Sequence, residues 1–138
     1  MSRIDPAWVL QLPKIADPRG NLTVIESGRH VPFVFQRIFY LYDVPGGASR
    51  AGHALKTCEQ FLIAMSGSFD VTLDDGYERQ KFQLNRSYLG LYIPPMIWRE
   101  IDNFSSGAVC LALASHPYDE NDYYRDYNAF LKAVRGAA

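Results

Sequence analysis

The segment EQFLIAMSGSFDVTLDDG, residues 59–76, decides the fold class of this chain. Its first part, Glu59 to Met65, is an apolar run of strand length that ends before a Ser-Gly turn. A second short strand, Ser68 to Leu73, follows and leads into Asp74-Asp75-Gly76, a sequence typical of a β-hairpin. Arg79 to Leu84 is the expected returning strand. The segment therefore predicts antiparallel sheet.

The sequence on both sides continues this pattern of short strands separated by turn residues. Asp17-Pro18-Arg19-Gly20 has turn chemistry near the N-terminus. Further strands are expected at Asn21 to Glu26, Phe33 to Tyr42, Gly90 to Ile93 and Val109 to Ala114. Because no helical periodicity separates these strands, a barrel or a sandwich is favoured over alternating βαβ units.

The C-terminal tail has a different periodicity. From Asp119 through Tyr123, Tyr127, Phe130 and Val134, large apolar groups recur every three or four residues. That spacing predicts an amphipathic helix packed on the barrel. With no repeat, linker or low-complexity tract, residues 1–138 are expected to form one domain.

Composition excludes several classes of function. The chain is 48% hydrophobic, 14% aromatic and 21% charged, which is typical of an ordered globular protein. Its net charge is -1 and its basic residues are scattered, so a nucleic-acid partner is not expected. No run approaches the roughly 20 apolar residues that span a bilayer, so no membrane partner is expected and a cytoplasmic location is predicted. Cys58 and Cys110 lie in apolar stretches and are expected to be buried thiols.

Two short motifs of metal-binding cupins can be laid on the chain. The first offers His-x-His and then Glu; His53 and Glu59 fit it, and Leu55 stands where the second His is expected. The second offers Pro-x-Gly-x-x-His-x-x-x-Asn; here Pro94 and Asn103 fit, and Arg99 replaces the His. This resemblance implies an all-β fold, a cupin-type antiparallel β-barrel or jelly roll with a C-terminal helix.

The same motifs argue against a metal. A guanidinium stays protonated and offers only donors, and a leucine side chain has no lone pair, so two of four ligands are missing. His53 and Glu59 alone fall short of the three or four protein ligands that such sites use. We therefore expect no metal and no other cofactor. His53 and Leu55 alternate on one strand and should share a face that points into the barrel.

Across nearly its whole length the chain resembles the WxcM-like sugar-nucleotide 3,4-ketoisomerases, which are metal-free cupins acting on dTDP-4-keto-6-deoxy-D-glucose. The segments that carry this resemblance are Asp17-Pro18-Arg19-Gly20, Arg37 with Phe39-Tyr40, Arg50-Ala51-Gly52-His53-Ala54-Leu55-Lys56, Glu59-Gln60, Leu73-Asp74-Asp75-Gly76, Gly90-Leu91-Tyr92, Trp98-Arg99-Glu100, Asn103-Phe104-Ser105-Ser106 and Leu113-Ala114-Ser115 with Tyr118-Asp119-Glu120.

The chain departs from the family at one position that matters for chemistry. The family's first motif resembles Arg-Gly-x-His-Ala-His-Lys, and its second His is implied to be the principal acid/base residue; here that position is Leu55. The family also associates the residue at Arg99 with the configuration of the product at C4. By resemblance Arg99 implies the gluco-type product, whereas Arg19 matches the galacto-type pattern.

The implied reaction assigns roles to three residues. Moving the carbonyl from C4 to C3 requires a base with a near-neutral pKa, and His53 is the candidate. The developing enediolate needs a fixed cation, which Arg99 supplies in this hypothesis. Tyr40 is the candidate for assisting His53. The structural alternative for a lone strand histidine is a core residue whose polar groups are satisfied.

Substrate binding is expected from a second set of side chains. Guanidinium groups pair with diphosphates, which makes Arg19, Arg37 and Arg50 candidates, with Lys56 beside them. Trp98 or Tyr40 is placed to stack on the thymine or the sugar. Gln60 and Asn103 complete the set. Each has an ordinary alternative, a solvated strand residue for the cations and a core position for the aromatics.

Three functions remain open from the sequence. The first is an active ketoisomerase whose partner is the dTDP-linked 4-keto-6-deoxy sugar, serving deoxyamino-sugar synthesis for O-antigen or S-layer glycans. The second is a nucleotide-sugar binding protein that lost catalysis when Leu55 replaced the base. The third, a metal-dependent cupin, is disfavoured by the missing ligands. Because edge strands of a small barrel invite pairing between chains, a homodimer is expected.

Overall fold

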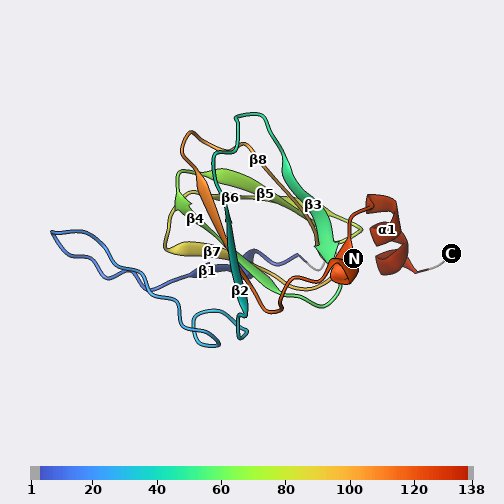
Figure 1. The fold of residues 1–138 in the computed structure, drawn as a ribbon, viewed down its shortest axis with the longest axis horizontal. Coiled ribbons are helices and arrows are strands. Elements are labelled where there is room, and N and C mark those ends of the chain that lie inside the picture. Colours follow the sequence, from blue (N-terminus) through green and yellow to red (C-terminus); the bar gives the residue numbers. More distant parts are fainter. Residues whose placement is uncertain (1–3, 137–138) are drawn as a thin grey trace.

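The computed structural model describes residues 4–136, and within them two five-stranded antiparallel sheets face each other (Figure 1). One sheet has the strand order β1-β7-β4-β9-β2 and the other β10-β3-β8-β5-β6. The elements are η1 Pro6–Trp8, β1 Val9–Gln11, β2 Arg37–Leu41, β3 Arg50–Leu55, β4 Gln60–Ser66, β5 Phe69–Asp74, β6 Arg79–Leu84, β7 Leu89–Ile93, β8 Trp98–Asp102, β9 Val109–Ala114, η2 Glu120–Asp122, β10 Tyr123–Tyr124 and α1 Tyr127–Arg135. This architecture confirms the prediction of an all-β, cupin-type fold with a C-terminal helix.

Alternation along β4 shows how the layers form. Leu62 and Ala64 face the space between the sheets, where they join the main apolar core. Phe61 and Ile63 face outward, where they pack under Leu12 and other residues of the N-terminal region. Successive strand residues point to opposite faces, so one short segment contributes to two separate cores.

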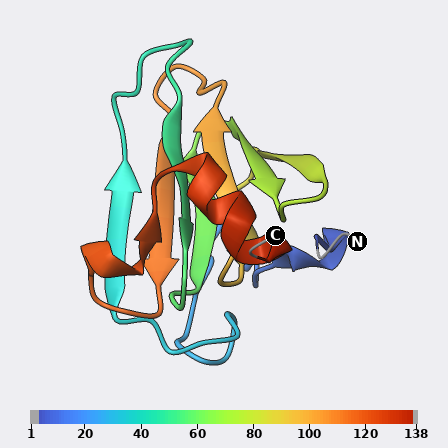
Figure 2. The ribbon, with the colours of Figure 1, turned by 90° about the vertical axis from the view of Figure 1, so that its right-hand side faces the viewer.

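The outer face of the second sheet is covered by α1. Ala54 and Trp98 on the sheet pack against Phe130 of the helix, and Figure 2 shows the helix lying across these strands. The Asp126 carboxylate accepts a hydrogen bond of 3.2 Å from the Ala129 backbone N–H and so caps the first turn. None of the described helices is long and apolar enough to cross a membrane.

The 59–84 segment folds as its sequence predicts. β4, β5 and β6 lie within one or two residues of the expected strands, and β5 pairs with β6 in an antiparallel hairpin. At the turn the Asp74 carboxylate accepts a hydrogen bond of 2.7 Å from the Gly76 backbone N–H. Gly76 has φ +96°, a left-handed conformation that favours glycine. Cys58 and Cys110 are buried free thiols, as expected.

One predicted strand is absent, and the predicted helix has a different start. Residues 21–26 form no strand, and only an isolated bridge between Ile15 and Leu22 occurs there. The reason is that this part of the chain lies in an arm, residues 13–24, which extends away from both sheets (Figure 1). The helix also begins later than expected, because Tyr123 pairs with Leu55 of β3 in a short strand.

Candidate active site

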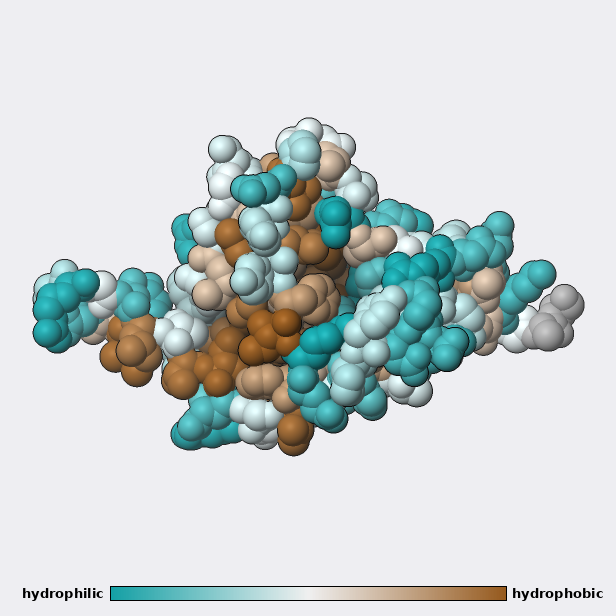
Figure 3. Space-filling model, viewed as in Figure 1, coloured by the Kyte–Doolittle hydropathy of each residue, from teal (hydrophilic) through white to brown (hydrophobic). Residues whose placement is uncertain are grey.

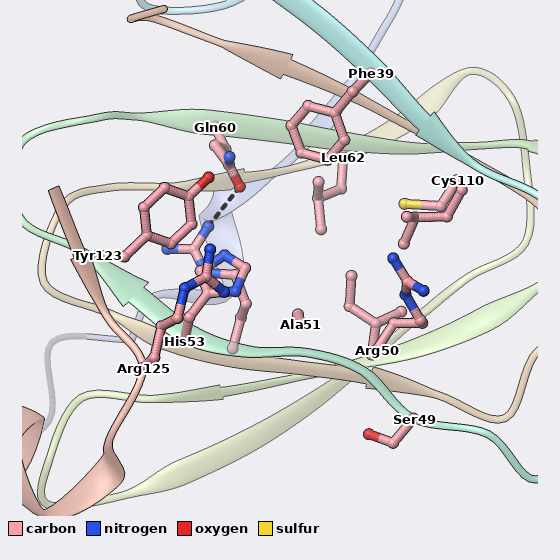
Figure 4. Close-up of a pocket in the computed structure, with 13 residues that line it drawn as sticks. Phe39, Ser49, Arg50, Ala51, His53, Gln60, Leu62, Cys110, Tyr123 and Arg125 are labelled. Atoms are coloured by element: carbon pink, nitrogen blue, oxygen red, sulfur yellow. Dashed lines mark hydrogen bonds between the residues drawn. The ribbon is translucent and has the colours of Figure 1, made fainter. Parts of the chain in front are cut away.

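A cavity of about 380 Å³ opens between the two sheets. Its walls come from inward-facing residues of β2, β3, β4, β8 and β9, from the residue before β3, and from β10 and the residue that follows it. The lining residues are Phe39, Leu41, Ser49, Arg50, Ala51, His53, Gln60, Leu62, Arg99, Ile101, Cys110, Tyr123 and Arg125 (Figure 4). Three of these are arginines, and no carboxylate of residues 4–136 lines the cavity, so it favours an anionic ligand.

His53 and Arg99 lie at the centre of this wall as cross-strand partners on β3 and β8. The register shifts between Ala51 and His53, where Ala51 and Gly52 both have left-handed backbone, at φ 72° and 74°. A bulge of this kind changes the direction of the following side chain. Here it precedes His53, whose ring lines the cavity.

Arg99 is 1% exposed and lies among neutral partners. Its Nη1 donates a hydrogen bond of 2.8 Å to Gln60 Oε1, and its Nη2 donates one of 3.0 Å to the Ile97 carbonyl oxygen. Its Nε has no partner, and no ion pair to Arg99 occurs among the described residues. Burial lowers the pKa of Arg99 to about 10, so the group remains a cation near neutral pH.

His53 is partly buried beside these charges. Burial, followed by the positive charges of Arg99, Arg125 and Arg37, lowers the pKa of His53 to about 3. The Ala51 backbone has the opposite effect and raises the pKa of His53. Neither ring nitrogen makes a hydrogen bond of normal geometry within residues 4–136. The imidazole is therefore neutral at pH 7 and has a free nitrogen available to accept a proton.

Tyr123 and Arg125 close one end of the cavity from the C-terminal segment (Figure 4). The Tyr123 ring lies 5.0 Å from the His53 ring, centroid to centroid. The Arg125 guanidinium lies 4.3 Å from the centroid of the Tyr123 ring and is hydrogen-bonded to Glu120 at 2.6 Å. Neither residue was predicted for the site, because the apolar spacing of this segment predicts a helix; the aromatic-rich run before the helix cap was the remaining signal.

A second cavity of about 260 Å³ lies on the other side of Tyr123. Arg37 and Leu55 line it, together with Cys58 and residues of the loop after β9. The Arg37 Nη2 donates a hydrogen bond of 3.5 Å to the Tyr123 hydroxyl. Leu55 is fully buried and packs against the Tyr123 ring, which lines both cavities.

The cavity brings together four of the ten residues expected at the site: His53, Arg99, Arg50 and Gln60. Tyr40 lies outside it on the outer face of β2, 58% exposed and beside Tyr42. Phe39 takes the inward position, because alternate residues of a strand point to opposite faces. The placement of Tyr40 in the cavity is therefore corrected.

Four other expected residues also lie outside the cavity of this chain. Trp98 is on the outer face of β8, where it packs on Phe130 and its Nε1 donates to Glu100. Lys56 lies over the Tyr124 ring, and Asn103 follows the end of β8 and donates to Asp70. Arg19 is at the exposed turn of the arm, ion-paired with Asp17 at 2.9 Å. These four side chains do not line the cavity of this chain, because each projects from an outer face, a strand end or the arm; their roles in substrate binding stay predictions.

The cupin metal frame is not assembled. The Glu59 carboxylate accepts a hydrogen bond of 2.5 Å from the Tyr92 hydroxyl instead of lining the cavity. No group of three or more His, Cys, Asp or Glu side chains within residues 4–136 could hold a metal ion. With Leu55 apolar and Arg99 cationic, the donor set does not fit a divalent cation.

Comparison with known proteins agrees with this geometry. Residues 6–135 match the family described as FdtA: WxcM-like, C-terminal. A TDP-4-oxo-6-deoxy-alpha-D-glucose-3,4-oxoisomerase of Aneurinibacillus thermoaerophilus is 42% identical over 126 residues, which cover 91% of each chain.

Two solved structures have the same fold at substantial identity. The sugar 3,4-ketoisomerase QdtA of Thermoanaerobacterium thermosaccharolyticum, in complex with TDP, is 37% identical with a TM-score of 0.90, covering 92% of this chain and 93% of its own. The WlaRB TDP-quinovose 3,4-ketoisomerase of Campylobacter jejuni is 46% identical with a TM-score of 0.86, covering 90% and 95%. The chain therefore belongs to the FdtA family of WxcM-like proteins.

Proposed function

We infer that this chain is a TDP-sugar 3,4-ketoisomerase, which moves the keto group of TDP-4-keto-6-deoxyglucose from C4 to C3. The observation that carries this function is a neutral imidazole, that of His53, set among guanidinium groups in a cavity that no carboxylate of the described residues lines. The similarity to TDP-sugar 3,4-ketoisomerases over nine-tenths of the chain supports the same substrate class.

Substrate binding follows from the cations of the cavity. The diphosphate of a nucleotide sugar carries about two negative charges, and planar guanidinium groups pair with phosphate oxygens bidentately. Arg50 lies at the opposite end of the cavity from Tyr123 and Arg125 (Figure 4). We assign Arg50 to the diphosphate, while the sugar lies over His53 and Arg99.

The chemistry divides between His53 and Arg99. The C3 proton is acidified by the neighbouring ketone, and His53 removes it and returns a proton to C4. Arg99 lies across the strand pair, and its unpaired Nε is available to stabilise negative charge on the enediol oxygens. A well-placed acid/base of this kind contributes roughly a hundredfold to ten-thousandfold in rate.

Variants of the Thermoanaerobacterium enzyme support these assignments. A histidine-to-asparagine variant was crystallised with TDP-4-keto-6-deoxyglucose, and a double variant that replaces an arginine was crystallised with TDP. That histidine and that arginine are separated by the same number of residues as His53 and Arg99. The second position of the double variant falls, by the same offset, on Arg19.

The test is conversion of TDP-4-keto-6-deoxyglucose followed by NMR. The proposal predicts a 3-keto product at a rate well above the buffer reaction. A protein that binds TDP without converting the sugar would select the alternative, a binding protein, and Leu55→His would then be expected to create activity. The presence of His53 with an open nitrogen favours the enzyme.

We further propose a homodimer in which the arm, residues 13–24, lies on a second copy of the chain. The arm and β2 expose large apolar residues: Ile15, Leu22, Val24, Ile38 and Tyr40. Figure 3 shows apolar side chains gathered on the face beside the base of the arm. β2 is also an edge strand, and such edges pair readily. Arg19 would then reach the partner and not its own cavity.

Sedimentation of the full chain and of an Ile15→Asp, Leu22→Asp variant tests this arrangement. The dimer predicts twice the monomer mass for the natural chain and dissociation of the variant. A monomeric natural chain at micromolar concentration would rule the dimer out.

We place the reaction in the cytoplasm, in the supply of deoxyamino sugars for O-antigen or S-layer glycans, because nucleotide-linked deoxysugars are the substrates of the relatives.

A further inference from the structure

The ketoisomerase reaction moves two protons, and His53 accounts for only one of them. The C3 proton leaves and a proton returns to C4, so one proton passes between carbons. The oxygen on C3 begins as a hydroxyl and ends as a ketone, and the oxygen on C4 changes in the opposite sense, so a second proton passes between oxygens. A second group in the cavity that can both donate and accept is suited to carry this proton.

Tyr123 is the side chain placed for this second transfer. Of the described residues that line the cavity, the other neutral groups able to exchange a proton are Ser49 and Cys110, besides His53. Burial raises the pKa of Cys110 to about 12, and Figure 4 shows Ser49 and Cys110 away from Tyr123 and His53. The Tyr123 ring lies 5.0 Å from the His53 ring, at the same end of the cavity.

The position of Tyr123 is fixed from both sides. Its backbone pairs with Leu55, so its side chain lies on the face of the sheet that carries His53 and Leu55. The preceding residue, Asp122, accepts hydrogen bonds from the Thr57 and Cys58 backbone N–H groups at 2.9 and 3.1 Å. The phenol is therefore held at the mouth between the two cavities and does not move freely.

Both cationic and neutral groups face the phenol. The groups that face it are Arg37 from β2, His53 from β3, Arg99 from β8, Cys58 from the β3–β4 turn, and Tyr118 and Arg125 from its own segment. The hydroxyl accepts a hydrogen bond of 3.5 Å from Arg37 Nη2, which leaves its own proton free to donate.

We propose that Tyr123 carries the proton that passes between the two oxygens while His53 carries the one that passes between the two carbons. This role rests on the proposed function. As His53 takes the C3 proton, the phenol donates its proton to the C4 oxygen, and an enediol forms. The phenolate then takes the proton from the C3 oxygen, the C3 ketone forms, and His53 returns a proton to C4. Atoms and charge balance, and no oxidant or cofactor takes part.

Tyr123→Phe removes the hydroxyl and keeps the ring that packs on Leu55 and Cys58. The proposal predicts that kcat falls about 100-fold or more, with the Kd for TDP unchanged within about threefold. Tyr124→Phe is the matched control, since that ring packs toward Phe130 on the other face and its loss of a hydroxyl should leave kcat unchanged. Retention of a third of the natural kcat by Tyr123→Phe, or a parallel loss of TDP binding, would overturn the role.

A second measurement separates proton transfer from packing. Fluorotyrosine at position 123 makes the phenol more acidic than that of tyrosine with little change in shape, so the alkaline limb of the kcat profile should move to lower pH. The same substitution at position 124 should leave the limb in place. An unmoved limb at position 123 would contradict proton transfer by Tyr123. A natural protein that binds TDP but forms no 3-keto product would instead refute the proposed function, and this role with it.

Discussion

His53 and Arg99 are direct cross-strand partners, and the positive charge of Arg99 is one of the causes that keep the imidazole of His53 neutral. This pairing links the two groups to which the proposed mechanism assigns the base and the stabilising cation. A base must be free of its proton before it acts, and a buried cation beside it disfavours the protonated form. The same cation is then available for the enediol oxygens.

The stability of the protein should fall in acid because of His53. Its pKa of about 3 in the folded protein lies below the ordinary value of 6.5, so above pH 6.5 both the folded and unfolded states are neutral. As the pH falls below 6.5, the unfolded state binds a proton that the folded state does not bind. The free energy of unfolding therefore decreases until the pH reaches about 3. Between pH 7 and 4.5 the free energy of unfolding should fall by on the order of 2 kcal/mol less in His53→Asn than in the natural protein. Denaturant unfolding at both values measures it, and equal losses in the two proteins would contradict the assignment.

Binding of TDP should raise the pKa of His53. An anion close to the arginines offsets their charge, and a nearby negative charge favours the imidazolium. Nitrogen-15 NMR of the histidine rings with and without TDP measures the shift, and His30, which accepts a hydrogen bond from Glu26 in the region between the arm and β2, is the internal control. A His53 pKa that TDP leaves unchanged would place the nucleotide away from this ring.

Arg99→Met should separate stability from binding. The guanidinium is buried with neutral partners only, and a well-packed apolar side chain avoids the cost of desolvating a charge. We expect a melting temperature equal to or above that of the natural protein, with affinity for TDP-4-keto-6-deoxyglucose, whose sugar is assigned to Arg99, reduced by about 2 kcal/mol. Calorimetry gives both quantities. A large fall in melting temperature with unchanged affinity would mean that Arg99 is structural.

Gly90→Ala tests the packing that supports the first sheet. A Cβ at Gly90 would overlap the Phe61 ring, which is fully buried on the outer face. We expect a loss of about 1–3 kcal/mol in the free energy of unfolding, because a filled core tolerates extra volume poorly. Gly46→Ala is the control, since its Cβ would meet no atom within 4 Å. Equal stability of the two variants would show that the Phe61 ring moves freely.

The sequence predicted the parts of the fold that local chemistry decides. The hairpin at Asp74-Asp75-Gly76 depends on a side-chain hydrogen bond and a glycine conformation, both of which are encoded within a few residues. His53 and Leu55 share a face, as alternation along a strand requires.

The parts of the fold and of the site that the sequence did not predict depend on pairing between distant segments. Tyr123 and Arg125 reach the cavity only because β10 pairs with β3, across more than sixty residues of sequence. Tyr40 and Trp98 were expected inside, and the register of β2 and β8 turns both to the outer faces. A shift of one residue reverses the face of a strand side chain, and residue type alone does not fix that register.

The most direct test is the rate at which the C3 hydrogen of TDP-4-keto-6-deoxyglucose is lost in deuterated water, measured by proton NMR for the natural protein and for His53→Asn. The account predicts rapid loss with the natural protein and at least a 100-fold slower loss with the variant, while both bind TDP equally. Loss at the same rate in the two proteins would contradict it, because the base would then be another group.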